Sequence, residues 1–255
     1  MNGFLLSALI AGLLCGFVDA SLGMGYGVTS ATVLVTLGIA PAVASASVHT
    51  SEMIVDSVSA LSHHKLGNVE FKWLKSLLLS GVLGAVFGAV FLVYVAGLGF
   101  AKPYIRAVLL VMGAIILYKH TLGWRKQKNS KLQWKNKHLA FLGFFASFID
   151  VSGGGGWGPI MTPTFIMTGS NPRKAVGTVE FTEPLVSLAA VLTFGALIGF
   201  DTFLWSIVLP MIIGGVVLTP FASWLTKKTP KRMLGVAIGL WLTLLNVYGL
   251  VSVFA

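Results

Sequence analysis

The sequence predicts an all-α integral membrane protein built from two inverted repeats, each a broken or re-entrant helical hairpin plus three transmembrane helices. Of 255 residues, 56% are hydrophobic and 10% are charged, and the mean hydropathy is +0.88. Soluble domains carry about 25% charged residues. Apolar runs of about 20 residues, the length of a helix that crosses a bilayer, recur with short polar gaps. We therefore expect one multi-pass domain with the lipid bilayer as its surroundings.

An internal repeat relates the two halves of the chain. The segment from Asp19 to Gly27 corresponds to the segment from Asp150 to Gly158 at an offset of 131 residues. The same offset aligns Gly38 with Gly169, Pro41 with Pro172, Ala44 with Ala175, Glu52 with Glu183 and Leu61 with Leu192. We divide the chain into a first transmembrane repeat (1–120), a basic linker (121–137) and a second transmembrane repeat (138–255).

Each repeat contains five apolar segments. The first two of each repeat are short and are separated by the glycine motif, because glycine lowers helix stability and permits other backbone angles. The two short segments together are too long for one straight crossing, which favours a hairpin. The expected segments are 3–18, 24–38, 42–64, 73–98 and 101–119 in the first repeat, and 139–151, 158–169, 174–198, 203–225 and 231–254 in the second.

Positive charge sets the expected orientation. Lys and Arg gather in a few connections, which then lie on the cytoplasmic side of the cell (inner) membrane: Lys65 to Lys75, Arg125 to Lys137, Arg173 to Lys174 and Lys227 to Arg232. With hairpins that return to their starting side, this rule places both termini outside, makes the linker 121–137 cytoplasmic and inverts one repeat relative to the other. A nucleic-acid partner is not expected, because no soluble domain presents the charge.

Most of the acidic residues occur in apolar segments, where an ionised carboxylate costs at least about 2.5 kcal/mol and usually marks an ion or proton path. His49, Glu52 and Asp56 share one stripe of a helix, as do Glu180 and Glu183 in the matching helix. We assign these five residues to proton coupling. The alternative interpretation of buried carboxylates is structural, and pairing with a histidine would explain Asp56.

The two chain breaks carry the candidate substrate site. Glycine-rich turns at helix N-termini present backbone N–H groups that can hold a small anion; close helix packing is the alternative role of such glycines. Asp19 and Asp150 precede the breaks and could cap them or contact substrate. The residues predicted to bind substrate are Gly23, Gly25, Tyr26 and Gly27 in the first repeat and Ser152, Gly154, Gly156, Trp157 and Gly158 in the second.

Three basic side chains receive structural interpretations. His63 and His64, beside Lys65, are expected to be solvated at the end of their segment. Arg106 lies just inside the start of a segment, and we expect it to snorkel outward. None of the three is assigned to the site.

These motifs resemble the TauE/SafE sulfite-exporter-like family of membrane permeases over nearly the whole chain. The resemblance is carried by the duplication, the two glycine motifs and the turns Gly38-Ile-Ala-Pro41 and Gly169-Ser-Asn-Pro172. Tyr26 departs from the family pattern, because a glycine is usual there. The resemblance implies export or uptake of small anions, such as sulfite, organosulfonates or carboxylates, without a bound cofactor.

The leading hypothesis is a proton-coupled secondary transporter of a small anion. The alternative is a transporter of a metal cation or Na⁺, with the buried carboxylates as hard oxygen ligands; no dedicated metal site is assigned. An enzyme is not expected, because the sequence lacks H-E-x-x-H, G-x-S-x-G and Walker A motifs. Homo-oligomerisation, substrate identity and transport direction are left open.

Overall fold

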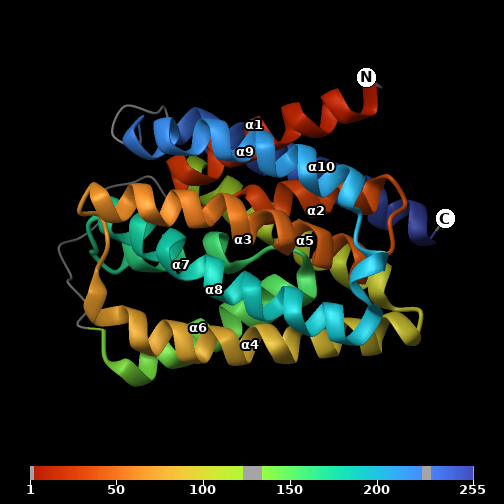
Figure 1. Ribbon diagram of the computed structural model, residues 1–255, viewed down its shortest axis with the longest axis horizontal. Helices are drawn as coiled ribbons and strands as arrows, with labels where there is room; N and C mark the ends of the chain where they lie inside the picture. Colours follow the sequence, from red (N-terminus) through yellow and green to blue (C-terminus); the bar gives the residue numbers. More distant parts are fainter. Residues whose placement is uncertain (1–2, 123–133, 226–230, 255) are drawn as a thin grey trace.

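The computed structural model describes residues 3–122, 134–225 and 231–254, and these residues form a bundle of helices (Figure 1). The helices are α1 (Gly3–Leu22), α2 (Tyr26–Thr36), α3 (Pro41–Lys65), α4 (Phe71–Gly97), α5 (Ala101–Thr121), α6 (Asn136–Gly153), α7 (Trp157–Met167), α8 (Pro172–Ile198), the 3₁₀ turn η1 (Phe200–Thr202), α9 (Trp205–Leu225) and α10 (Lys231–Phe254). The all-helical fold class is therefore confirmed. Most of the predicted linker, residues 123–133, and the loop 226–230 lie outside the described residues.

Local sequence explains where the long central helices begin. Pro41 and Pro172 occupy the first positions of α3 and α8, where a missing N–H costs nothing and the fixed φ suits a helix. Each follows a turn through a glycine with positive φ, Gly38 at 87° and Gly169 at 91°. Gly-x-x-Pro is thus a reverse turn that leads into a long helix in both halves.

The breaks lie where the glycine motifs predict them. Gly23 and Gly25 have φ of 67° and 133°, and Gly154 and Gly155 have φ of 77° and 154°. Residues with a Cβ rarely adopt these angles. As a result the backbone leaves the helical conformation between α1 and α2, and again between α6 and α7.

Helices at equivalent positions of the two halves make equivalent contacts. α2 and α7 have bounds that differ by the repeat offset, and α1 packs along α9 as α6 packs along α4. A Cβ built on Gly16 would lie 2.8 Å from Cα of Gly215. At the equivalent positions of the other half, a Cβ on Gly84 would lie 3.0 Å from Cβ of Ser147. Both interfaces thus depend on the same close approach of small residues.

The central pair of helices is α3 and α8, one from each half, packed against each other. Figure 1 shows them running in opposite directions along the long axis of the molecule, and α4 and α9 are likewise opposed. The figure also shows α1 and α2 folding back on each other, as the expected hairpin requires. These directions support the predicted inversion of the repeats.

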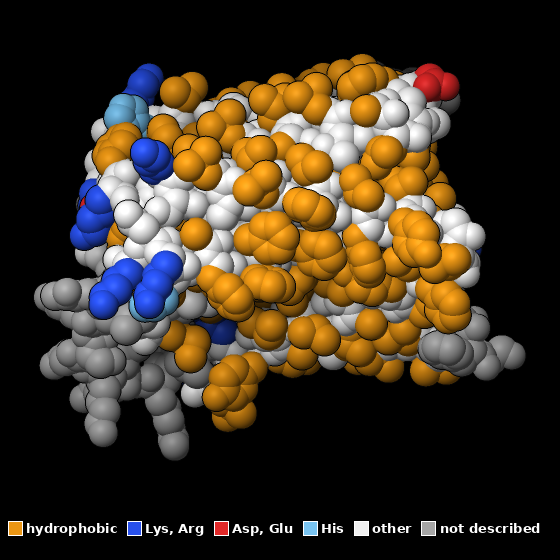
Figure 2. Space-filling model, turned by 90° about the horizontal axis from the view of Figure 1, so that it is seen from below, with side chains coloured by type: hydrophobic (Ala, Val, Ile, Leu, Met, Phe, Trp, Pro, Cys, Tyr) orange, Lys and Arg blue, Asp and Glu red, His pale blue; other side chains and the backbone are white. Residues whose placement is uncertain are grey.

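The outer surface suits a bilayer. Among the described residues, four helices, α4, α5, α8 and α9, are long and apolar enough to cross a membrane, while Gly235–Val251 of α10 is a shorter apolar helix. α3 has 25 residues but buries serines and charged groups along its length. Figure 2 shows one face covered by hydrophobic side chains, with Lys and Arg gathered at one end. Large apolar side chains that face outward are typical of contact with lipid.

Candidate functional site

Both breaks are capped by the aspartate that precedes them. Asp19 Oδ1 accepts a hydrogen bond from the backbone N–H of Tyr26 at 3.3 Å. Asp150 Oδ1 accepts from Gly156 N at 2.7 Å and from Trp157 N at 3.1 Å. These donors belong to the N-termini of α2 and α7, which carry partial positive charge. In this structure the chain's own carboxylates therefore occupy donors that the sequence assigned to a substrate anion.

The two glycine motifs also pack directly against each other. A Cβ on Gly27 would lie 3.2 Å from Cα of Gly155 and 2.7 Å from Oε1 of Glu52, and a Cβ on Gly158 would lie 2.7 Å from Gly23 O. The backbones can approach this closely because no side chain separates them. Gly27, Gly155 and Gly158 thus allow the two breaks to pack closely. Close packing is the alternative role that the sequence indicated for such glycines.

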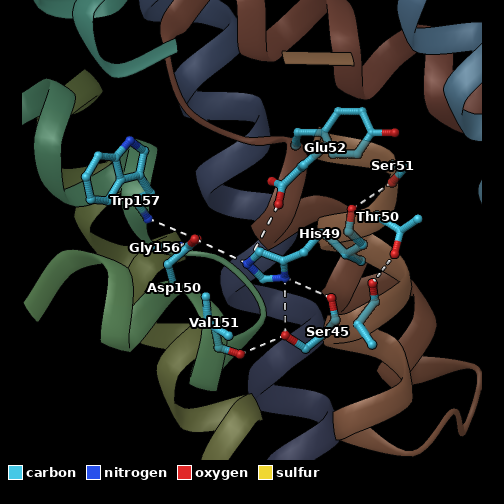
Figure 3. A network of polar contacts seen from close by, with 12 residues as sticks. Ser45, His49, Thr50, Ser51, Glu52, Asp150, Val151, Gly156 and Trp157 are labelled. Carbon is cyan, nitrogen blue, oxygen red and sulfur yellow. Dashed lines mark hydrogen bonds and ion pairs between the residues drawn. The ribbon is translucent and has the colours of Figure 1, made fainter. Parts of the chain in front are cut away.

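His49 links the two halves at this meeting point (Figure 3). Its Nδ1 lies 2.8 Å from the carbonyl oxygen of Ser45, and its Nε2 lies 3.2 Å from Asp150 Oδ2 and 3.8 Å from Glu52 Oε2. Ser45 in turn donates to the carbonyl of Val151 at 2.7 Å. An imidazole held between two carboxylates in a buried site can exchange a proton with either of them.

The other predicted carboxylates lie between α3 and α8. Ser59 donates to Glu180 Oε2 at 2.6 Å, which ties the two helices together. Asp19, Asp56 and Glu183 form a group in which one carboxylate oxygen from each residue lies within 4.8 Å of the others. The sequence placed these three in different segments and gave no sign that they meet.

The two halves differ chemically at equivalent positions. The repeat offset aligns His49 with Glu180 and Asp150 with Asp19. On one side the aspartate at the break contacts an imidazole, whereas on the other side it joins two further carboxylates. The duplication has therefore produced one mixed acid and base site and one site with only acids.

Every predicted site residue is buried, including the glycines and the five residues assigned to proton coupling. The Ser152 hydroxyl lies 2.7 Å from Tyr104 Oη and also donates to Phe148 O, so it serves helix packing in this structure. The Trp157 indole donates to Val179 O at 3.4 Å within the hydrophobic core. Tyr26 lies in the second core cluster.

Two expectations about basic side chains are wrong. His63 is fully buried, with Nε2 3.3 Å from the carbonyl oxygen of Ala20, although its neighbour His64 is exposed as expected. Arg106 does not snorkel outward; it is 8% exposed and donates to Val35 O at 3.3 Å. His63 thus contacts a carbonyl in the last turn of α1. Arg106 contacts one in the last turn of α2, which also accepts from the backbone N–H of Gly38.

A multi-pass helical bundle in which two broken helices meet among buried carboxylates defines a membrane transporter. The model of one family, Sulfite exporter TauE/SafE, matches residues 8–249. The chain is also 39% identical over 243 residues to the probable membrane transporter protein YtnM of Bacillus subtilis (strain 168), covering 94% of this chain and 81% of that protein. This chain belongs to the Sulfite exporter TauE/SafE family, and it is a transporter and not an enzyme. No solved structure matches it.

Proposed function

We propose that this transporter moves a small anion, namely a sulfur-containing oxyanion, an organosulfonate or a carboxylate, across the cytoplasmic membrane in a proton-coupled cycle. The observation that carries the proposal is the pair of capped breaks, where backbone N–H groups of α2 and α7 already bind carboxylates. Donors that hold an aspartate have the geometry and the polarity to hold a substrate oxyanion. The family description, which names sulfite, supports the same substrate class.

The coupling follows from competition for these donors. Asp150 and an incoming anion need the same N–H groups of Gly156 and Trp157. Protonation of Asp150 weakens its hold on the donors and removes a negative charge that repels the substrate. The anion and the proton therefore favour each other's binding, and by linkage the anion binds more tightly as the pH falls.

His49 and Glu52 complete the proposed proton path. His49 Nε2 faces both Asp150 and Glu52, so a proton can pass among the three groups without crossing hydrocarbon. Glu52 Oε1 also lies against Gly27 of the other break, where a Cβ would come within 2.7 Å of it. Protonation of these groups thus acts at both breaks at once. In the same proposal, protonation of Glu180 acts on its hydrogen bond to Ser59, which joins α3 to α8.

The burial of the whole site corresponds to an occluded conformation in the proposed cycle. Access from each side would come from rocking of one repeat against the other about the meeting point of the breaks. We propose that the repeats are inverted in the membrane, with both termini outside. The opposed directions of α3 and α8 in Figure 1 and the gathering of Lys and Arg at one end in Figure 2 support this orientation.

A cation transporter is the second candidate function. The specific observation in its favour is the group of Asp19, Asp56 and Glu183. Their oxygens lie close together, and within the described part of the chain several of them have no hydrogen-bonding partner. A bound cation can be either the transported ion or the ion that drives transport of another substrate. Transport of radiolabelled anion and of radiolabelled cation into the same proteoliposomes distinguishes the two functions.

The proposal is tested by anion binding to the purified protein at two pH values. Thiosulfate and methanesulfonate stay fully ionised between pH 6 and 8, so a change of affinity over that range belongs to the protein. We expect at least one anion of a panel that also includes sulfite and acetate to raise the unfolding temperature, more at pH 6 than at pH 8. Stabilisation by none of these anions at either pH would refute anion transport.

A further inference from the structure

Asp19, Asp56 and Glu183 form a group of three carboxylates that is buried inside the bundle, and none of them caps α7. Asp19 is in the last turn of α1, Asp56 is in α3 and Glu183 is in α8. One oxygen atom of each lies within 4.8 Å of the other two, and the residues are 3%, 1% and 4% exposed. Three separate helices thus direct acidic side chains to one buried point.

Four of the six carboxylate oxygens in this group have no hydrogen-bonding partner among the residues that the structure describes. Neither carboxylate oxygen of Asp56 has one, and the same is true of Asp19 Oδ2 and Glu183 Oε2. Asp19 Oδ1, in contrast, accepts from Tyr26 N, so this bond orients the carboxylate and leaves its other oxygen unpartnered. Buried polar atoms without partners cost about 1–3 kcal/mol each, and more when charged, unless a ligand satisfies them.

Ionised carboxylates at this point need a positive charge beside them. His49, the base at the meeting point of the breaks, is held by Asp150 and Glu52. His63, two turns along α3 from Asp56, contacts the carbonyl of Ala20. Even a protonated His63 would offset only one of the three carboxylates. Buried carboxylates without a counter-charge are strongly destabilising.

The ligand set and its spacing indicate the kind of cation. All three donors are hard carboxylate oxygens, with no Cys or His in the group. Three oxygens that lie within 4.8 Å of one another have a common centre at most about 2.8 Å from each, so a small inward shift of the carboxylates brings them to the about 2.3–2.6 Å of Ca²⁺–O bonds. Mg²⁺ demands near-ideal octahedral geometry and gives up its water ligands reluctantly, so it suits a buried group of three carboxylates less well. Na⁺ has nearly the radius of Ca²⁺ and fits the same space.

We propose that Asp19, Asp56 and Glu183 form a binding site for a hard cation of the size of Ca²⁺ or Na⁺, separate from the His49–Asp150 pair. Asp19 also caps α2, so a bound cation stabilises the first break directly. His49 lies beside the aspartate of one break, and the cation lies beside the aspartate of the other. This inference does not rest on the proposed anion function, because it concerns binding of a cation without substrate.

The test is binding of Ca²⁺, Na⁺ and Mg²⁺ to the purified full-length protein without substrate, in a choline chloride buffer of constant ionic strength. We expect saturable binding of Ca²⁺ or Na⁺ by calorimetry, a matching rise in unfolding temperature and weaker binding of Mg²⁺. Competition between Na⁺ and Ca²⁺ identifies the occupant. Asp56→Asn and Glu183→Gln keep the side-chain shape but remove a ligand charge, and each should weaken binding by at least about tenfold.

The variants also separate a cation site from a structural role. Without cations, both should be at least as stable as the wild type, because a repelling buried charge is gone. Asp201→Asn, at an exposed acid, should leave binding unchanged. If the two variants cannot be purified, the wild-type titration decides. Absence of saturable Ca²⁺ or Na⁺ binding, equal binding of Mg²⁺, or full binding by Asp56→Asn would overturn the proposal and leave protons as the neutralising species.

Discussion

His49 Nε2 lies 3.2 Å from Oδ2 of Asp150, which joins α3 of the first repeat to the break between α6 and α7 of the second. The pair brings together residues 101 positions apart, and both side chains are buried. It therefore connects α3, which also carries Glu52 and Asp56, to the N–H donors of the break. The proton path and the anion site of the proposed mechanism meet at this contact.

The first prediction concerns the strength of this contact. His49→Gln should lower the free energy of unfolding by about 3 kcal/mol, because it leaves Asp150 buried without its partner. Asp150→Asn keeps an oxygen that can cap α7, so its own effect should be smaller. Thermal unfolding of both single variants and of the double variant measures the coupling energy. Strictly additive effects of the two substitutions would show that the residues do not interact.

The second prediction tests the packing of the two breaks. Gly155→Ala should destabilise the protein by about 1–3 kcal/mol, because the position has φ of 154° and a Cβ there would meet the backbone of Gly27 and Val28. Gly97→Ala is the matched control, since a Cβ there has nothing within 4 Å. The unfolding temperatures of the two variants, measured in the same detergent, provide the comparison. Equal stability of the two variants would contradict the close approach of the breaks.

The third prediction concerns the bond between the central helices. Ser59→Ala removes the donor to Glu180 Oε2 and should cost about 1–3 kcal/mol, because it leaves a buried acceptor without a partner. Ser57→Ala on the same helix is the control, since that hydroxyl donates only to Met53 O one turn earlier. A cost at Ser57 as large as at Ser59 would show that the link between helices contributes nothing.

The fourth prediction addresses orientation in the membrane. Cys15 is buried and is the chain's one cysteine, so Cys15→Ala provides a background for labelling. In that background, Asp201→Cys should react with a membrane-impermeant maleimide in intact cells, whereas Arg173→Cys should react only after permeabilisation. Both positions are exposed: Arg173 lies in the first turn of α8, and Asp201 lies in η1, just after the end of α8. The reverse pattern would invert the proposed topology.

The sequence predicts the elements well because their signals are local. The repeat offset and the glycine motifs locate both breaks, and the Gly-x-x-Pro turns locate the starts of α3 and α8. Burial of the acids follows from their place in apolar segments. Burial of His63 could not be predicted in this way, because it depends on a carbonyl of α1 that is distant in sequence.

The partners within the site could not be predicted from helical spacing. Spacing shows that Glu52 and Asp56 share a face of α3, but not which residues of other helices they meet. The group of Asp19, Asp56 and Glu183 requires α1, α3 and α8 to converge, and only tertiary packing establishes that. Arg106 is a similar case, because the carbonyl that it contacts belongs to Val35 of α2, 71 residues away in the sequence.

In the proposed cycle, Asp150 exchanges its backbone donors with the substrate anion when it takes up a proton. The most direct measurement is uptake of radiolabelled thiosulfate and sulfite into proteoliposomes, with and without an imposed pH gradient, for the wild type and Asp150→Asn. We expect a pH gradient to drive uptake by the wild type, and we expect Asp150→Asn, still folded, to lose this dependence on pH. If uptake by Asp150→Asn responds to the gradient as uptake by the wild type does, the proposed exchange of donors by Asp150 is wrong.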